Sequence, residues 1–246
     1  MYTPRWPAQQ WEDRADYFLL HGPSPHHFFG LALRLRLGAE VSKHVRDVRS
    51  WFAERDRRRF TWVISDSATP SDLRERLLSL GAQPDAEEPL LAGMLLGEAP
   101  PAVESLDVRP VETFDEFCAA RELSWTNIGA MSEEERGQAQ ARLRQAWAEY
   151  QQVDIVVYAV FVEGRPVASG GAAFSDEGVV LAGASTHPDF RGRSCYRALV
   201  RARWDAAVAR GTPLLATQAG KMSRPILERL GFQQMATVHA LVDEVP

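Results

Sequence analysis

The sequence is poor in cysteine and has no long apolar run, and each absence excludes a class of protein. Two cysteines, Cys118 and Cys195, are too few for the disulfide framework of a small secreted domain. No Cys or His spacing matches a zinc site and no carboxylates cluster, so we predict no metal. No apolar segment approaches the roughly 18 residues of a membrane-spanning helix. The opening residues lack the apolar core of a signal peptide, so we predict a cytoplasmic protein with no membrane partner.

The chain also lacks an excess of basic charge. Its 28 Lys and Arg residues stand against 33 Asp and Glu, and the formal net charge is -5. This balance predicts no general attraction to nucleic acid, so any phosphate site must be local. Only Lys43 and Lys221 are lysines, and this bias toward arginine is typical of a GC-rich bacterial genome and of no particular activity.

The length and composition indicate one complete domain with a smaller companion. The chain has 246 residues, of which 45% are hydrophobic, enough to bury a sizeable core. Pro100 and Pro101 break any helix and favour an extended linker. We therefore predict two units, residues 1–100 and 101–246.

The second predicted unit has a readable order of elements. A short strand at 106–109 precedes two helices, each opened by a capping box, at Thr113-x-x-Glu116 and Ser132-x-x-Glu135. Three antiparallel strands follow, joined by turns at 163–166 and 175–178. The rest is a helix ending at Gly211, a strand at 214–217, a helix at 223–230 and a last strand at 235–242.

One face of the helix that ends at Gly211 is predicted to be buried, and its residues recur at helical spacing. That face carries Tyr196, Leu199, Val200, Trp204, Ala207 and Val208, whereas Arg201, Arg203 and Arg210 are expected off it.

The most informative segment joins the third of these strands to that helix. The apolar run 179–186 ends at His187-Pro188 and opens into Arg191-Gly192-Arg193 before the helix. The first turn of a helix has backbone N–H groups without intrahelical partners and a partial positive charge, so an anion there gains several hydrogen bonds at once. The segment therefore predicts a pyrophosphate site, with full charges added by Arg191, Arg193 and Arg197.

This strand, basic loop and helix, followed by Glu228-Arg229-Leu230-Gly231-Phe232, resembles the GNAT acetyltransferase superfamily over about the C-terminal three-fifths of the chain. In that family the loop reads Gln/Arg-x-x-Gly-x-Gly/Ala. Here Arg191 takes the first place, but Ser194 and Tyr196 stand at the two glycine places. Serine is a mild change if the backbone there is already helical, and its hydroxyl can donate to a phosphate oxygen. The larger Tyr196 must point away from the ligand, into the protein.

The resemblance implies an α/β (α+β) GNAT fold, with a mixed, mostly antiparallel sheet flanked by helices. It implies transfer of acetyl from acetyl-CoA to a primary amine of an unidentified small-molecule or peptide acceptor, without a metal. Backbone groups of the third strand would hold pantetheine and polarise the thioester, in a gap beside the strand at 214–218. The implied acetyl-CoA-binding residues are Ala184, Ser185, Thr186, Arg191, Gly192, Arg193, Ser194, Cys195, Tyr196 and Arg197.

The groups that transfer protons are not identified by the resemblance. Many members have a tyrosine four residues before the Gly-Phe pair, where this chain has Leu227, and the third strand holds no glutamate. His187 is a candidate only by residue type, and Gln218, Tyr158 and Trp125 are candidates to line the acceptor pocket. The catalytic residues are therefore unknown, and a non-catalytic acyl-CoA-binding sensor or scaffold remains the alternative.

Two residues have a purely structural interpretation as well as a functional one. Gly183 is consistent with a β-bulge or with simple packing. Cys195 lies in the loop where the family uses backbone amides, so we expect a spatial role, although a helix start and arginines can lower a thiol pKa.

The order of elements in the first unit repeats the order near the C-terminus. A strand at 60–64, a helix with Leu73 and Leu77 that stops at Gly81, and an apolar run at 90–96 match the strand, helix, Gly231 and strand near the C-terminus. An earlier helix has Val41, Val45, Val48 and Phe52 on one face. We interpret residues 1–100 as a reduced, cofactor-free copy of the same architecture. The alternative is that strand-helix-strand units ending in Gly are simply common.

Other features of the first unit are interpreted without a binding or catalytic role. The mixed charges at 54–59 predict a solvated helix end rather than a binding patch, and His26-His27 has no nearby ligand set. Three roles stay open for this unit: closing over the site, forming a homodimer surface, or stabilising the fold.

Overall fold

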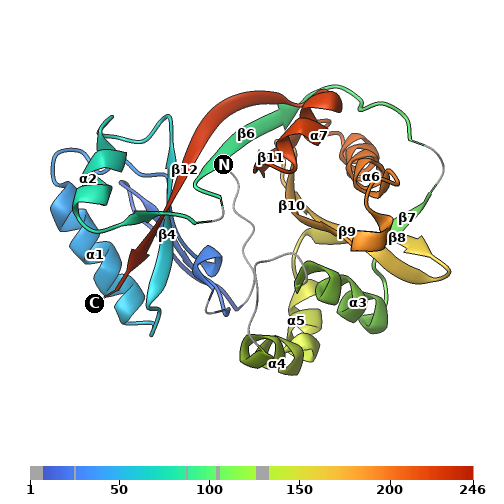
Figure 1. The fold of residues 1–246 in the computed structure, drawn as a ribbon, viewed down its shortest axis with the longest axis horizontal. Coiled ribbons are helices and arrows are strands. Elements are labelled where there is room, and N and C mark those ends of the chain that lie inside the picture. Colours follow the sequence, from blue (N-terminus) through green and yellow to red (C-terminus); the bar gives the residue numbers. More distant parts are fainter. Residues whose placement is uncertain (1–7, 25, 87, 104–105, 126–132, 246) are drawn as a thin grey trace. The chain divides into compact units, whose positions relative to one another are not determined.

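The computed structural model describes residues 8–245 apart from 25, 87, 104–105 and 126–132. The chain folds into two compact units. The N-terminal unit consists of residues 8–93, 218–225 and 234–246, and the C-terminal unit of residues 94–217 and 226–233. Both are sheets flanked by helices, and most strand pairs are antiparallel, as predicted (Figure 1). Within the described residues, no helix is long and apolar enough to cross a membrane.

The sheet of the C-terminal unit has the order β7-β8-β9-β10-β11. All of these pairs are antiparallel except β10 with β11, which is parallel. The predicted run of three antiparallel strands is therefore confirmed as β8, β9 and β10. The strands are β7 (Asp107–Pro110), β8 (Ile155–Val162), β9 (Arg165–Phe174), β10 (Val179–Thr186) and β11 (Leu215–Ala219).

Four longer helices accompany this sheet, together with the 3-10 helix η2 (Pro188–Phe190) and α7 (Arg224–Arg229). They are α3 (Phe114–Trp125), α4 (Glu133–Ala141), α5 (Leu143–Tyr150) and α6 (Cys195–Ala209). The capping box that opens α3 is confirmed, because the Glu116 amide donates to Thr113 Oγ1 (3.2 Å) and the Thr113 amide donates to the Glu116 carboxylate (3.3 Å). The second predicted box includes Ser132, which lies outside the described residues.

Helices α3 and α6 pack on opposite faces of this sheet. On β9, Ser169 Oγ donates to the carbonyl of Ala120 in α3 (3.2 Å). The next residue, Gly170, lies against the guanidinium of Arg203 in α6. Successive residues of a strand point to opposite faces, so these two contacts assign one helix to each face.

The predicted buried face of α6 needs two corrections. Arg203, expected off this face, is only 1% exposed, while Val208, expected on it, is 51% exposed. Arg203 stands seven residues after Tyr196 and therefore falls on the same stripe of the helix. Helical position, rather than polarity, decides which of these side chains is buried.

The sheet of the N-terminal unit has the order β1-β2-β3-β4-β12, and β5 also pairs with β12. Its strands are β1 (Gln10–Asp13), β2 (Phe18–His21), β3 (Gly30–Leu33), β4 (Arg59–Ser65), β5 (Gln83–Pro84) and β12 (Gln233–Glu244), and β6 (Leu90–Leu96) continues into the C-terminal unit. Its helices are η1 (His27–Phe29), α1 (Val41–Ala53) and α2 (Leu73–Ser79). The last strand of the chain thus completes this sheet by pairing with β4.

The two units share a strand-helix-strand arrangement. β3 and β4 are parallel and joined through α1, as β10 and β11 are parallel and joined through α6. The predicted stripe of α1 is buried throughout, at Val41, Val45, Val48 and Phe52. Gly81 follows α2 with φ +103° and Gly231 follows α7 with φ +96°, a backbone conformation that favours glycine.

Buried polar groups connect β12 to the core of the N-terminal unit. The carboxylate of Asp243, 2% exposed, accepts two hydrogen bonds from Arg49 in α1 (2.8 and 3.1 Å) and one from Trp62 Nε1 in β4 (2.8 Å). These contacts join residues 181 and 194 positions apart in the sequence. Because both oxygens have partners, the charge is compensated within the core.

The charged segment 54–59 is not uniformly solvated, which corrects the prediction for Arg57. Its side chain is 5% exposed, and the guanidinium donates to the carbonyls of Gly22 (2.8 Å), Ser24 (2.6 Å) and His26 (3.1 Å). Asp56 has φ +53°, so the chain turns sharply at the end of α1 and carries Arg57 inward. This arginine therefore fixes the 22–26 loop.

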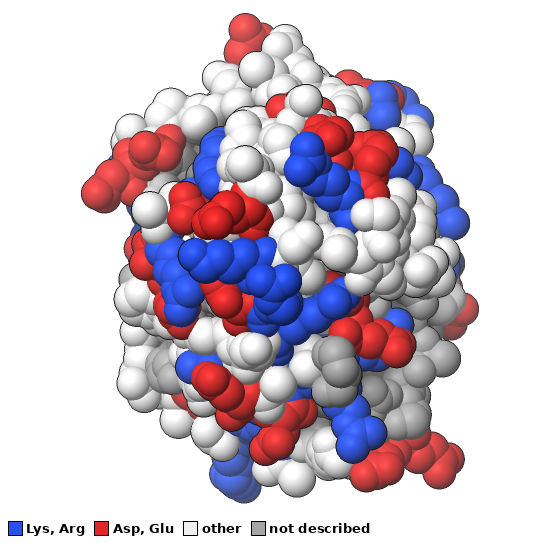
Figure 2. Space-filling view, turned by 90° about the vertical axis from the view of Figure 1, so that its left-hand side faces the viewer, with Lys and Arg blue, Asp and Glu red and all other residues white. Residues whose placement is uncertain are grey.

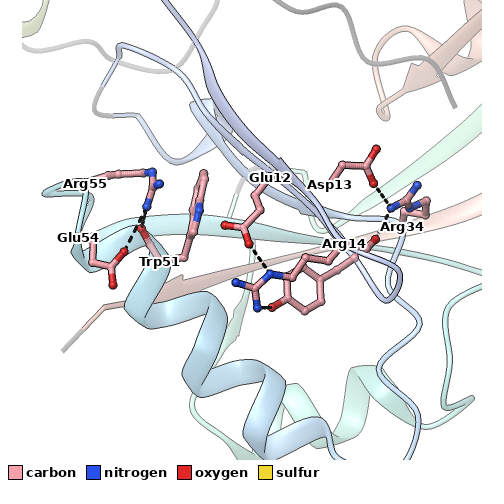
Figure 3. A network of polar contacts seen from close by, with 8 residues as sticks. Glu12, Asp13, Arg14, Arg34, Trp51, Glu54 and Arg55 are labelled. Carbon is pink, nitrogen blue, oxygen red and sulfur yellow. Dashed lines mark hydrogen bonds and ion pairs between the residues drawn. The ribbon is translucent and has the colours of Figure 1, made fainter.

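Other charges on the N-terminal unit form ion pairs in which at least one side chain is exposed. Figure 3 shows Arg14 with Glu12, Arg34 with Asp13, and Arg55 with Glu54. Arg55 also stacks on the Trp51 ring, 3.9 Å from its centroid. Figure 2 shows both signs of charge interspersed over one face of the molecule. Such pairs are typical of a solvated surface and contribute about 0 to 1 kcal/mol each.

Replacing Asp243 with Ala should lower the free energy of unfolding by about 3 kcal/mol, because Arg49 and the Trp62 N–H lose their buried acceptor. Urea denaturation followed by tryptophan fluorescence measures the change. Glu244→Ala is the matched control, since the next side chain on β12 is 81% exposed. Equal midpoints for the two variants would contradict this account of the core.

Candidate functional site

A β-bulge interrupts the middle of β10. Its register with β9 shifts between Ala182 and Ala184, and Gly183 has φ +33°, while a Cβ added to it would meet no described atom within 4 Å. Of the two interpretations of Gly183, the bulge is therefore confirmed. A bulge re-aims the residues that follow it, here Ala184 to Thr186.

One edge of β10 loses its partner strand just before this bulge. β10 and β11 are in register only at Val179 with Leu215 and Val180 with Ala216. The side chain of Thr217 then reaches the Leu181 carbonyl (3.4 Å), and no further residue of β11 pairs with β10 in the described structure. The backbone groups on this edge past residue 181 are therefore available for a ligand.

The loop after β10 has two residues in the left-handed region. The 3-10 helix η2 leads to Gly192 with φ +76°, and Ser194 follows with φ +60°. Helix α6 begins at Cys195, and its first backbone bond is donated by Ala198 to the Ser194 carbonyl (2.9 Å). The amides before Ala198 therefore lie at a helix start, where an anion is favoured.

Three arginines surround this helix start, and all are exposed. Arg191 Nε donates to the carbonyl of Thr186 (3.4 Å), which ties the loop to the end of β10. The Arg193 guanidinium lies over the Phe190 ring, 5.2 Å from its centroid. Neither Arg193 nor Arg197 has an ion pair with any described residue. The local field is therefore positive although the chain as a whole is acidic.

Ser194 does not have the backbone that would make serine a mild replacement for glycine. Its φ of +60° and ψ of 6° are left-handed, and its side chain makes no capping bond to α6. A residue with a Cβ in this region costs about 1 to 2 kcal/mol relative to the right-handed form. The loop therefore holds strain where the family uses glycine.

The two residues after Ser194 face the protein. Cys195 is buried, with Sγ near the carbonyls of Phe190 (3.7 Å) and Arg193 (3.8 Å), and burial raises the pKa of its thiol despite the nearby Arg193 charge. A protonated, buried thiol is a poor nucleophile. Tyr196 is half-buried, as its size requires, and burial raises the pKa of its phenol.

A pocket of about 520 Å³ lies on the α3 side of the C-terminal unit. It is lined by Asp115, Glu116, Ala119, Glu122, Leu123, Gly164, Arg165, Pro166 and His187. Three of these are carboxylates from α3. The hydrogen bond from Arg109 (2.6 Å) and those from the backbone lower the pKa of Glu116 to about 2, whereas Asp115 and Glu122 have no ion pair with the described residues.

The candidate residues for proton transfer and for the acceptor pocket do not come together. His187 lines the pocket, directly after β10, but Tyr158, Trp125 and Gln218 do not. Trp125 is buried among the α3 and α5 side chains, and Tyr158 packs on the other face with Leu199 of α6. Leu227, at the place of the family's tyrosine, is fully buried.

The pocket carboxylates and Arg203 were missed by sequence reasoning, although their spacing carries a signal. Asp115 and Glu122 are seven residues apart on one helix and so share a face. Among the described residues, no group of three His, Cys, Asp or Glu side chains could hold a metal ion.

No protein-family model matches this sequence, and no curated protein matches it. Solved structures do. A GCN5-related N-acetyltransferase from Kribbella flavida matches with a TM-score of 0.67 and 19% identity, over 96% of this chain and 90% of that one. A tandem GNAT protein from the clavulanic acid biosynthesis pathway matches with a TM-score of 0.62 and 15% identity, over 98% and 85%.

A third match is a GCN5-related N-acetyltransferase from Sphaerobacter thermophilus, with a TM-score of 0.61 and 13% identity over 94% of this chain and 81% of that one. Structural similarity at sequence identities this low establishes the fold and nothing more. The chain has the GNAT fold, as its sequence predicted, and the matches extend through both units.

Replacing Ser194 with Gly should raise the free energy of unfolding by about 0.5 to 1 kcal/mol, since relief of the left-handed strain exceeds the entropy cost of glycine. Urea denaturation measures this change. Ala198→Gly, a right-handed position in the same helix, is the control and should be destabilising. A loss of stability for both variants would mean that residue 194 is not strained.

Proposed function

We propose that this chain, whose fold is that of the GCN5-related N-acetyltransferases, transfers the acetyl group of acetyl-CoA to a primary amine. One observation carries the proposal: the bulged edge of β10, which past residue 181 has no strand partner among the described residues, leads directly into the arginine-bearing loop at the start of α6. An extended strand edge suits the amides of pantetheine, and a helix start suits a pyrophosphate. The two sites follow one another along the chain, as the two parts of the donor do.

In this proposal, β10 and the loop after it bind different parts of the donor. Backbone groups of Ala184, Ser185 and Thr186 would bond the pantetheine amides and polarise the thioester carbonyl. The amides that open α6, at Cys195, Tyr196 and Arg197, would bond the pyrophosphate, with charge added by Arg191 and Arg193. Donors fixed by the backbone need no reorganisation as charge develops, which favours the transition state.

The reaction needs a neutral amine within reach of the thioester carbon. Its nitrogen lone pair forms the C–N bond, the carbonyl oxygen becomes an oxyanion, and collapse of this intermediate breaks the C–S bond with the electron pair leaving on sulfur. The proton lost from nitrogen passes to water or to the thiolate. Because a free thiol has a pKa of roughly 8.5, departure as thiolate is feasible without the tyrosine that Leu227 replaces.

The acceptor we propose is a cationic amine held by its charge in the α3 pocket. Asp115 and Glu122 line that pocket without ion pairs to the described residues, and the one arginine in the lining, Arg165, balances only one of them, so an ammonium group there would be favoured. A second, neutral amino group of the same acceptor could then reach the thioester. We propose that His187, which lines the pocket directly after β10, relays the proton of this amine to water.

The alternative is a protein that binds acyl-CoA without turnover. The strained Ser194 and the buried Leu227 favour it, because both depart from the pattern of active relatives. Release of free thiol from acetyl-CoA in the presence of a panel of polyamines and aminosugars separates the two functions. Amine-dependent release supports the enzyme, and binding without release supports the alternative.

Removing the two loop arginines together, Arg191→Ala with Arg193→Ala, should weaken acetyl-CoA binding about 10- to 100-fold, because two charges near the pyrophosphate are lost. Folding should be nearly unchanged, since both side chains are exposed. Titration calorimetry measures the affinity. Arg201→Ala is the control, because this half-buried arginine of α6 contacts Asp205 and the Pro100 carbonyl instead of the loop. Unchanged affinity in the double variant would contradict the assignment of this loop as the pyrophosphate site.

Neutralising the pocket with Asp115→Asn and Glu122→Gln should raise the KM of a cationic acceptor about tenfold while leaving the KM of acetyl-CoA unchanged. Steady-state thiol release measures both constants. Asp176→Asn, in the exposed turn between β9 and β10, is the control. An equal rise in both KM values would mean that the carboxylates shape the fold rather than the acceptor site.

A further inference from the structure

The interior of the C-terminal unit contains a guanidinium without a counter-charge. Arg203 of α6 is 1% exposed. Its Nε donates to the carbonyl of Leu199 (2.9 Å) and its Nη1 donates to the carbonyl of Gly171 (3.0 Å). Among the described residues, its buried Nη2 has no hydrogen-bond partner and no carboxylate pairs with it. Burial lowers the pKa of Arg203 to about 10, so the group still carries its charge at neutral pH.

Such a charge is expensive for the fold. A buried ion without a counter-charge lowers the stability of the fold, and apolar side chains of similar volume are often neutral or stabilising in its place. The titratable groups that face Arg203 are the phenols of Tyr158 on β8 and Tyr196 on α6. Its neighbours on β9 and β10, Gly170 and Ala184, carry no charge. Folding alone therefore gives no reason for an arginine here.

The position of this charge relates it to the bulge. Arg203 Nη1 and the Cβ of Ala184 both lie within 3.3 Å of the point that a Cβ on Gly170 would occupy. Gly170 pairs with Tyr158 on one side and with Ala184 on the other. The absence of a side chain at residue 170 lets the guanidinium lie against the sheet, directly behind the first residue after the bulge.

We propose that Arg203 is a positioning residue whose buried charge stabilises the negative charge that acyl transfer creates beside Ala184. This inference rests on the proposed function. The charge appears first on the carbonyl oxygen when the C–N bond forms, and then on sulfur when the C–S bond breaks and the electron pair leaves with CoA. A fixed charge in a low-dielectric interior favours both anions over the neutral thioester.

The test uses CoA itself, so it needs no known acceptor. In complex with the wild-type protein, the thiol of CoA should ionise at lower pH than in water, because Arg203 favours the thiolate. Arg203→Met and Arg203→Gln remove the charge and should raise the pKa of the bound thiol by about one unit or more. The absorbance of the thiolate in the ultraviolet reports the titration. CoA affinity at pH 6, where the thiol is protonated, should change little.

Two further variants separate electrostatics from packing. Arg203→Lys keeps the charge and should restore the lower thiol pKa, at least in part. Arg201→Met, on the same helix but paired with Asp205 and away from the sheet, should leave it unchanged. Arg203→Met should also unfold at an equal or higher temperature than the wild type, while amine-dependent thiol release falls about 10- to 100-fold in kcat. A purely structural arginine would show the opposite, with lost stability and an unmoved thiol pKa.

The outcomes distinguish this proposal from the proposed function. If CoA binds and its thiol titrates identically in the wild type and in the Met and Gln variants, the role of Arg203 is overturned while acyl transfer stands. If CoA does not bind the wild-type protein, the proposed function fails and this inference falls with it. If only the charge-removing variants shift the titration, the inference holds.

Discussion

The short parallel pairing between β10 and β11 is the constraint on which the candidate site depends. Two residues of each strand are in register, and beyond them β10 keeps β9 as its only strand partner among the described residues. Because β10 is paired with β9 along one edge and lacks a described partner along most of the other, it can present backbone groups to a ligand while it stays in the sheet. The bulge at Gly183 follows at once, and the loop of Arg191 to Ser194 then delivers the chain to the start of α6.

In the function that we propose, the backbone does most of the binding and the arginines supply the electrostatic stabilisation. Exposed arginines lie at the loop, where a pyrophosphate would keep part of its hydration. One buried arginine, Arg203, lies behind the bulge, where water is excluded and a charge acts more strongly. Under this proposal the same residue type would serve two purposes, one at exposed positions and one at a buried position. The acidic net charge of the chain does not conflict with a polyanionic donor, since the charges near the loop are local.

Much of this fold follows from local sequence rules. The capping box at Thr113, the hairpin turns of β8 to β10 and the glycines after α2 and α7 each act over a few residues, so the sequence predicts them. The partners of Arg57 and Arg203 could not be predicted in this way. The carbonyls that Arg57 contacts lie 31 to 35 residues away, and one of the two acceptors of Arg203, the Gly171 carbonyl, lies 32 residues away. Ser194 shows a further limit. Serine would be a mild replacement for glycine if the backbone there were helical, but the loop imposes a left-handed backbone at this residue.

The most direct measurement is the melting temperature of the protein titrated with acetyl-CoA, and in parallel with dephospho-CoA and with ATP. A ligand that binds only the native state raises the apparent stability as its concentration increases. If β10 and the α6 loop form one donor site, acetyl-CoA raises the melting temperature in a saturable way and ATP, which lacks pantetheine, raises it less. No shift with millimolar acetyl-CoA would contradict the account and would mean that Ser194 and Tyr196 have closed the site.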